Sequence, residues 1–237
     1  MINTILFDLD GTLLPMDTEK FTKIYMISLM TSGITCRPIR FLRDMKKCIY
    51  DTLDDTTPRT NETVFYENFG KTSKIKPQRL QKFSEKYYAS KRFDKTKKAT
   101  WKSAEMREAV DLLKQKGYSV MVATNPMFPE LAVNKRMEWA GFTRDEFDYV
   151  TSFERSCYCK PNKEFFDQLM QDTGRTAEQC LMVGNDRAED LAASKAGIKT
   201  YLVEDCVHHA DDKEFTPDYT GNAKDFLDFC KSLPIVK

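Results

Sequence analysis

Several short groups of polar and acidic side chains stand out along this chain of 237 residues. Together they supply carboxylates, a lysine ammonium group, a hydroxyl and amides. Four such groups are Asp8-Leu9-Asp10-Gly11-Thr12, Thr124-Asn125, Lys160-Pro161, and Gly184-Asn185-Asp186 with Asp190. Carboxylate oxygens suit a hard divalent cation, and carboxylates also act as nucleophiles and as general acids and bases. The set contains the residue types that transfer of a phosphoryl group requires.

Each group alone also has a purely structural explanation. The first suits a turn, the second the start of a helix, and the third a solvated lysine before a helix. The fourth suits an acidic helix N-terminus, which the helix dipole favours. Four unrelated coincidences at the ends of predicted strands are a weaker explanation than one shared site, and we therefore predict a site.

The elements that would position these groups alternate between strand and helix. Residues 4–7 form a short apolar run ending at Asp8, and from about residue 102 the two patterns alternate. Strands are predicted at 4–7, 118–123, 149–152, 180–183 and 200–203, and helices at 103–116, 129–140, 163–172, 188–196 and 223–231. Repeated strand–helix units predict an α/β fold with a parallel sheet covered on both faces. Ligands bind beyond the carboxyl ends of such strands.

Residues 17–100 interrupt this pattern with apolar side chains at helical spacing and few strand signals. Proline residues at 58 and 77 divide this block. We therefore predict two domains. One is an α/β core made of residues 1–16 and 101–237, and the other is a separate helical domain, residues 17–100, inserted after the first strand.

The four groups, in this order, resemble the sequence signatures of the haloacid dehalogenase-like (HAD) superfamily, in its phosphatase branch. The resemblance covers residues 1–16 and about 102–205, and the insertion falls where that family places a helical cap. It implies a Rossmann-like, doubly wound parallel sheet with a separate cap domain. The second aspartate, Asp10, favours phosphoryl transfer, because a dehalogenase that attacks carbon does not need it.

The resemblance also implies roles for the acidic residues. Asp8 would be the nucleophile that forms an aspartyl-phosphate. Asp10 would protonate the leaving oxygen and then deprotonate the attacking water. Mg²⁺ would be the cofactor, held by the carboxylates of Asp8 and Asp186 and by the backbone carbonyl of Asp10.

Further residues of the resemblance would act on the phosphoryl group. Thr124 would hydrogen-bond its oxygens, with the Asn125 amide beside it. Lys160 would neutralise negative charge on the nucleophile and in the transition state. Asp190 would support the metal side or orient Lys160.

The function that this resemblance implies is Mg²⁺-dependent hydrolysis of a phosphomonoester, acting on a small anionic phosphometabolite. Two alternatives stay open at this point. One is a phosphoglucomutase-type phosphotransferase, in which the aspartyl-phosphate passes to a sugar instead of water. The other is a non-catalytic protein that binds a phosphorylated metabolite. Nothing in the sequence indicates the natural substrate or the oligomeric state.

Charge divides between the two predicted domains. Residues 17–100 hold 19 basic and 10 acidic side chains, a net charge of +9, and the remainder of the chain carries −8. A basic cap would attract anionic substrates. Arg40, Arg43 and Lys47 share one predicted helix face and could line the pocket, although a solvated basic face is the simpler interpretation.

Composition excludes several other classes of protein. The chain has 37 basic and 36 acidic residues, a net charge of +1, which argues against a nucleic-acid partner. No apolar run approaches the ~20 residues of a membrane helix, and the N-terminus does not resemble a signal peptide. The 7 scattered cysteines indicate free thiols in a cytoplasmic protein. His208 and His209 are interpreted as part of a solvated loop.

Overall fold

The computed structural model describes residues 1–73 and 75–236. Its strands are β1 (Thr4–Phe7), β2 (Ser119–Val122), β3 (Tyr149–Val150), β4 (Cys180–Gly184), β5 (Lys199–Val203) and β6 (Tyr219–Gly221). Its α-helices are α1 (Thr18–Met30), α2 (Pro38–Leu53), α3 (Asn61–Thr72), α4 (Pro77–Ala89), α5 (Ala104–Gln115), α6 (Glu130–Ala140), α7 (Lys163–Thr173) and α8 (Ala223–Ser232). Its 3₁₀ helices are η1 (Phe93–Ala99), η2 (Arg144–Glu146), η3 (Ala177–Gln179) and η4 (Leu191–Ala196).

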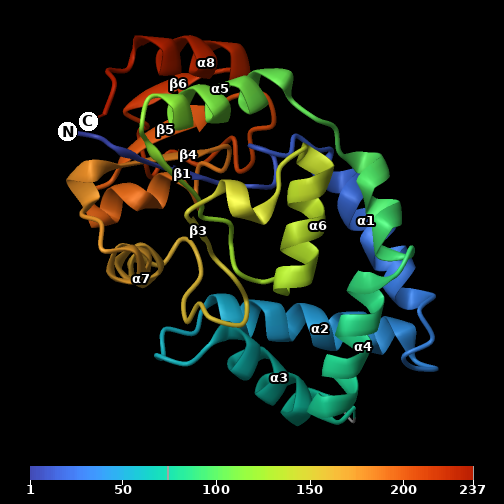
Figure 1. Ribbon diagram of the computed structural model, residues 1–237. Helices are drawn as coiled ribbons and strands as arrows, with labels where there is room; N and C mark the ends of the chain where they lie inside the picture. The colour runs from blue at the N-terminus through green and yellow to red at the C-terminus, as the bar shows by residue number, and fades with distance from the viewer. Residues whose placement is uncertain (74, 237) are drawn as a thin grey trace.

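The strands form one six-stranded sheet in the order β3-β2-β1-β4-β5-β6, and every pairing is parallel (Figure 1). The chain moves outward from β1 to β2 and β3 on one side, then returns to β4 on the other. The strand order therefore reverses at β1, and a crevice forms there beyond the carboxyl ends of the strands. The predicted doubly wound α/β sheet is confirmed.

Side chains alternate between the two faces of the central strand. Ile5 and Phe7 pack in one hydrophobic cluster with residues of α5, α6 and α8, whereas Leu6 packs in a second cluster with residues of α7 and η4. All three side chains are fully buried. The sheet is thus covered on both faces, which explains why its central strands are apolar at nearly every position.

Four of the predicted core helices are present with nearly the predicted bounds, because their ends carry recognisable caps. The Ser103 hydroxyl accepts a hydrogen bond from the backbone N–H of Met106 at 3.1 Å and starts α5. Gly141 and Gly174 end α6 and α7 in the left-handed conformation, with φ of 94° and 64°.

The structure corrects the prediction at two places. Residues 188–196 do not form one helix, because the Arg187 N–H donates to the distant His208 carbonyl at 3.2 Å and residues 187–190 form a turn. In this turn the Asp186 carboxylate accepts hydrogen bonds from the N–H groups of Ala188 and Glu189, both at 2.9 Å. The chain turns around that carboxylate, and only the short 3₁₀ helix η4 follows. Strand β6 was not predicted, because its three residues at the sheet edge are too few to show a periodic pattern.

Residues 17–100, called here the helical segment, contain α1 to α4 and η1. Its two connections run side by side: the Asp17 N–H donates to the Ala99 carbonyl at 2.9 Å, and the Trp101 N–H donates to the Pro15 carbonyl at 3.0 Å. Figure 1 shows α2, α3 and α4 apart from the sheet, at the lower edge of the view. Separation into a core domain and a cap domain at these residues stays a prediction.

Aromatic side chains join the helical segment to the sheet region. Tyr25, Tyr88 and Phe93 belong to the same buried cluster as Phe7. The rings of Phe93 and Trp139 lie 5.3 Å apart between η1 and α6. This packing fixes η1 against α6 and places α1, through Tyr25, in the same cluster as the central strand.

None of the helices in residues 1–73 and 75–236 combines the length and the apolar character that a bilayer crossing requires. The seven cysteines are all free, as predicted.

Candidate active site

A cavity of about 350 Å³ opens at the carboxyl ends of β1, β2 and β4, and we call it the strand-end cavity. The structure brings every predicted site residue to its wall. These residues are Asp8, Asp10, Thr124, Asn125, Lys160, Asp186 and Asp190. The parallel sheet causes this convergence, because its adjacent strands end at the same edge.

Lys160 lies between two carboxylates in the floor of the strand-end cavity. Its Nζ donates to Asp8 Oδ1 at 2.9 Å and to Asp190 Oδ1 at 2.5 Å, and its side chain is only 1% exposed. Burial raises the pKa of Asp8 and that of Asp190, against the effect of the neighbouring ammonium group. Burial alone would lower the pKa of Lys160, but the two carboxylates raise it. The lysine is therefore a fixed cation beside Asp8.

Asp190 connects two parts of the site. One of its oxygens holds Lys160, and the other accepts the backbone N–H of Asp186 at 2.9 Å. Gly184 makes this position possible, because a Cβ there would lie 2.1 Å from Asp190 Oδ2. A larger residue at the end of β4 would push Asp190 away from Lys160.

Asp10 lines the strand-end cavity, but its carboxylate is already engaged. Oδ2 forms an ion pair with Arg136 of α6, while the buried Oδ1 accepts no hydrogen bond from the described residues. Arg136 is fully buried, and its guanidinium lies 4.3 Å from the centre of the Phe128 ring. Sequence reasoning missed Arg136, because a single arginine in an amphipathic helix carries no distinguishing signal.

The loop after β2 is held by hydrogen bonds around Thr124 and Asn125. The Thr124 carbonyl accepts the Thr151 hydroxyl at 2.6 Å. Asn125 Nδ2 donates to Glu189 Oε2 at 2.9 Å and to the Lys160 carbonyl at 3.3 Å. The Asn125 side-chain amide thus connects the loop of Lys160 with that of Glu189. Burial raises the pKa of the Glu189 carboxyl group.

The two histidines lie closer to the site than predicted. Their side chains are each 48% exposed, but Nδ1 of His208 and Nδ1 of His209 both lie 2.8 Å from oxygens of Asp186. The backbone fixes this position, since the His208 N–H donates to the Asn185 carbonyl at 3.0 Å. Sequence reasoning treated the pair as a solvated loop. The only signal available was that the chain has no other histidine.

The donor atoms at the strand-end cavity fit a hard cation such as Mg²⁺. Asp8 and Asp186 offer carboxylate oxygens, the ligand type that Mg²⁺ prefers. Hydrogen bonds from Glu189 N–H and the histidines lower the pKa of Asp186, although burial acts to raise it, so its charged form is favoured. Cation binding to Asp186 would require an imidazole to release one carboxylate oxygen.

A family model described as haloacid dehalogenase-like hydrolase matches residues 5–203, most of the chain. The chain belongs to the haloacid dehalogenase-like hydrolase family. It is therefore a hydrolase, and the matched region includes all seven predicted site residues.

Individual proteins similar to this HAD-family chain include both curated sequences and solved structures. The pyrophosphatase PpaX of Halalkalibacterium halodurans is 26% identical over 231 residues, which cover 96% of each chain. A HAD phosphatase from Thermococcus onnurineus superposes with a TM-score of 0.64 at 16% identity, covering 99% of this chain and 100% of that one. The L-2-haloacid dehalogenase of Xanthobacter autotrophicus gives 0.59 at 13% identity, covering 98% and 100%. Likeness to both kinds of structure shows the fold alone.

The basic residues that were candidates for the pocket of this HAD hydrolase lie outside it. Arg40 and Arg43 both pair with Asp44, at 3.5 and 3.4 Å, and Lys47 pairs with Asp51 at 2.6 Å. None of the three lines the strand-end cavity. The simpler interpretation, a solvated basic face, is the correct one.

Replacing both Arg40 and Arg43 by glutamine should therefore leave kcat/KM for a phosphomonoester within about twofold of the unmodified protein, as for other surface substitutions. Steady-state kinetics with an aryl phosphate would check this. A loss of tenfold or more would place this helix face in the substrate pocket after all.

Proposed function

We propose that this HAD-family hydrolase is a Mg²⁺-dependent phosphatase that hydrolyses a small phosphorylated substrate through an aspartyl-phosphate. The observation that carries the proposal is the position of Asp8. Asp8 directly follows the central strand β1 and contacts the buried cation Lys160. Asp186 lines the same cavity. A buried carboxylate with a fixed cation beside it is suited to attack an anionic phosphorus centre.

In the first step the Asp8 carboxylate attacks phosphorus, and the bond from phosphorus to the leaving oxygen breaks. Asp10 gives its proton to that oxygen, which departs as an alcohol. In the second step Asp10 takes a proton from water, which attacks the aspartyl-phosphate and releases inorganic phosphate and free Asp8. Asp10 would have to turn from Arg136 toward the substrate for both proton transfers.

Fixed charges and hydrogen-bond donors would stabilise the phosphoryl group in both steps. Lys160 offsets the negative charge that builds up as Asp8 and the phosphate approach each other. Thr124 lies at the end of β2, where its hydroxyl can donate to a phosphoryl oxygen. Asp190 keeps Lys160 in place, and Asn125 keeps the loops of Lys160 and Glu189 together.

Mg²⁺, when bound, would neutralise the phosphoryl oxygens and align them with the nucleophile. The Asp8 and Asp186 carboxylates and the Asp10 backbone carbonyl would hold it. The N–H group of Asp186 donates to the Asp190 carboxylate, which also accepts a hydrogen bond from Lys160. This links the residue that would hold the cation to the lysine.

Two further points support phosphoryl transfer over dehalogenation. Asp10 supplies a general acid that protonates the departing alcohol and a general base that activates the water. Carboxylate attack on carbon needs no such group. The curated PpaX relatives are named pyrophosphatases, and hydrolysis of a phosphoanhydride uses the same phosphoryl chemistry.

Transfer of the phosphoryl group to a sugar, as in a phosphoglucomutase-type enzyme, is the second candidate within the same mechanism. Product analysis with sugar phosphates would separate the two, because a transferase would form an isomeric or doubly phosphorylated sugar instead of inorganic phosphate. A protein that only binds a phosphorylated metabolite would release neither product.

Removing divalent cations with EDTA should lower the rate of aryl phosphate hydrolysis by about 100-fold or more, because the phosphoryl charge would be neutralised by Lys160 alone. Added Mg²⁺ should restore the rate. A thermal melt with and without EDTA would show that the chain stays folded. Full activity in EDTA would contradict the proposed metal dependence.

We also infer a reducing compartment such as the cytoplasm as the working location. All seven cysteines are free, and four of them are buried. Burial raises the pKa of the Cys159 thiol to about 12, so this thiol stays protonated and unreactive.

A further inference from the structure

The wall of the strand-end cavity that faces the site floor is largely apolar. It is formed by α1, α2 and the loop after β2. Its apolar side chains are Phe21, Met26, Ile49, Leu53, Met127 and Phe128. Thr18, Thr22 and Tyr25 add hydroxyl groups to this wall but no charge, and the Tyr25 hydroxyl is already paired with that of Tyr88 at 2.6 Å. A leaving group that projects from the phosphate would meet this wall.

Cations are scarce around the strand-end cavity. Of the described residues, only Lys160 and His208 contribute basic side chains to its wall. Lys160 already has two carboxylate partners, and His208 contacts Asp186. Binding would therefore transfer a second anionic group of the substrate from water to a wall that has no free cation to pair with it. This transfer would make the binding free energy less favourable.

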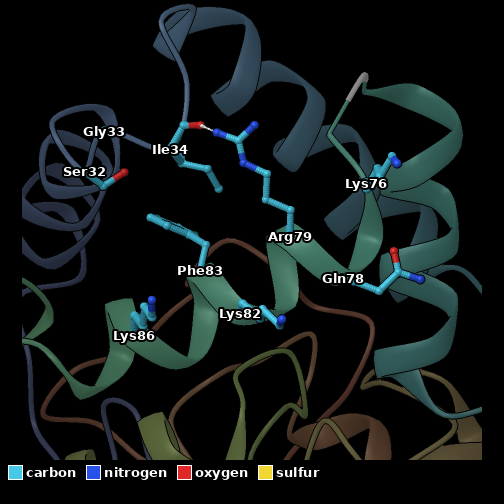
Figure 2. A pocket seen from close by; sticks show the side chains of 9 residues that line it. All are labelled: Ser32, Gly33, Ile34, Lys76, Gln78, Arg79, Lys82, Phe83 and Lys86. Carbon is cyan, nitrogen blue, oxygen red and sulfur yellow. Dashed lines mark hydrogen bonds between the residues drawn. The ribbon is translucent and has the colours of Figure 1, made fainter.

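Four basic side chains of the helical segment line a different surface. A groove of about 510 Å³ lies between the loop after α1 and one face of α4, and we call it the α4 groove (Figure 2). Lys76, Arg79, Lys82 and Lys86 line it, and Arg79 donates to the Ile34 carbonyl at 3.1 Å. No described residue lines both the α4 groove and the strand-end cavity. The net charge of the segment is thus no guide to the charge of the substrate.

A second, smaller cavity extends the apolar wall into the helical segment. This apolar compartment, about 140 Å³, shares Tyr25, Ile49, Met127 and Phe128 with the strand-end cavity. Its far side consists of aromatic and aliphatic side chains, among them Phe65 of α3. The four shared side chains place the compartment directly behind the apolar wall of the strand-end cavity.

We propose that the substrate is a phosphomonoester whose leaving group is an uncharged, apolar alcohol, most favourably one that carries an aromatic ring. The phosphate would lie on the floor beside Asp8 and Lys160. The ring would lie against Ile49 and Phe128 and reach toward the apolar compartment, where burial of its surface and contact with aromatic edges favour binding. This inference rests on the proposed phosphatase activity and names its substrate class.

The test compares phosphate esters whose leaving groups differ in polarity but not in chemical type. Phenethyl phosphate and glycerol phosphate both release an alkyl alcohol, so their intrinsic reactivities are similar. A difference in kcat/KM between them therefore measures the contact of the leaving group with the apolar wall. With Mg²⁺ present, kcat/KM for phenethyl phosphate should exceed that for glycerol phosphate by about tenfold or more. Phosphoglycolate and pyrophosphate, which carry a second anionic group, should be poorer still.

Equal values of kcat/KM, or a preference for phosphoglycolate or pyrophosphate, would overturn this inference while leaving the phosphatase proposal intact. If no ester is hydrolysed faster than by the Asp8→Asn variant, the phosphatase proposal itself is wrong. The panel therefore distinguishes the two failures.

Helix α2 offers a matched pair of substitutions. Ile49 lies on the wall shared by both cavities, whereas Ile39 of the same helix is 79% exposed and lines neither. Ile49→Lys should lower kcat/KM for phenethyl phosphate by about tenfold and change glycerol phosphate by about twofold or less. Ile39→Lys should change neither.

A proportional loss with every substrate in folded Ile49→Lys protein would contradict the proposed contact. If that variant does not fold, Met26→Gln on α1 provides the same comparison, because Met26 is a half-buried part of the same wall. Circular dichroism and a thermal melt would establish folding for each variant.

Discussion

Asp8→Asn is expected to lower kcat/KM for an aryl phosphate by about 10⁴-fold or more, as loss of a catalytic nucleophile does. Asparagine keeps the size of the side chain but cannot form an acyl phosphate. Lys160 would keep Asp190 as a partner at 2.5 Å, so the cavity floor should persist. The loss should therefore be one of kcat, with the fold retained.

Rapid quenching with a radiolabelled substrate would test the intermediate directly. The unmodified protein should carry acid-stable label on the peptide that contains Asp8, and Asp8→Asn should carry none. Asp228→Asn is a matched control, because Asp228 is an exposed residue of α8 that pairs with Lys231 at 2.9 Å. Appreciable activity in folded Asp8→Asn protein would be incompatible with the mechanism.

Lys160→Met is expected to damage stability and activity together. The lysine is buried between the Asp8 and Asp190 carboxylates, at 2.9 and 2.5 Å. Removing one partner from a buried ion pair costs about 3–5 kcal/mol of unfolding free energy, because the remaining charges are left without compensation. Loss of a fixed cation from the transition state should also lower kcat by about 10²-fold or more.

Urea denaturation and steady-state kinetics would measure the two effects of Lys160→Met. Lys163→Met serves as the control, since Lys163 is half-exposed and pairs with Asp167 on the surface of α7. Such a surface pair contributes about 1 kcal/mol or less. If Lys160→Met were as stable and as active as Lys163→Met, the buried triad would have neither of the roles argued for it.

The fold was predictable to a large extent because its signals are local. Apolar runs of four to five residues, such as Thr4–Phe7 and Cys180–Gly184, are typical of strands buried on both faces. Glycines after α6 and α7 marked where those helices end. The errors fell where contacts between residues distant in sequence decide the local structure. Within residues 187–190, the Arg187 N–H donates to the His208 carbonyl at 3.2 Å and Asp190 accepts a hydrogen bond from Lys160.

The sequence predicted which residues form the candidate site, but not which side chains contact each other there. Asp8, Thr124 and Asp186 follow strands, so a parallel sheet had to bring them to one edge whatever the loops do. The partner of Asp10 could not be found in the same way. Arg136 lies 126 positions away in the sequence, and only the packing of α6 against the strand ends brings the two together.

The same distinction separates what the sequence determined about this protein from what only the tertiary structure decided. Strand-end carboxylates and the order of the four groups indicated the family, the sheet and the candidate site residues. The tertiary structure decided which face of the helical segment meets the site, and that face is apolar although the segment is basic. The physical reason is that net charge counts side chains irrespective of direction, whereas binding depends on the few that point into the cavity.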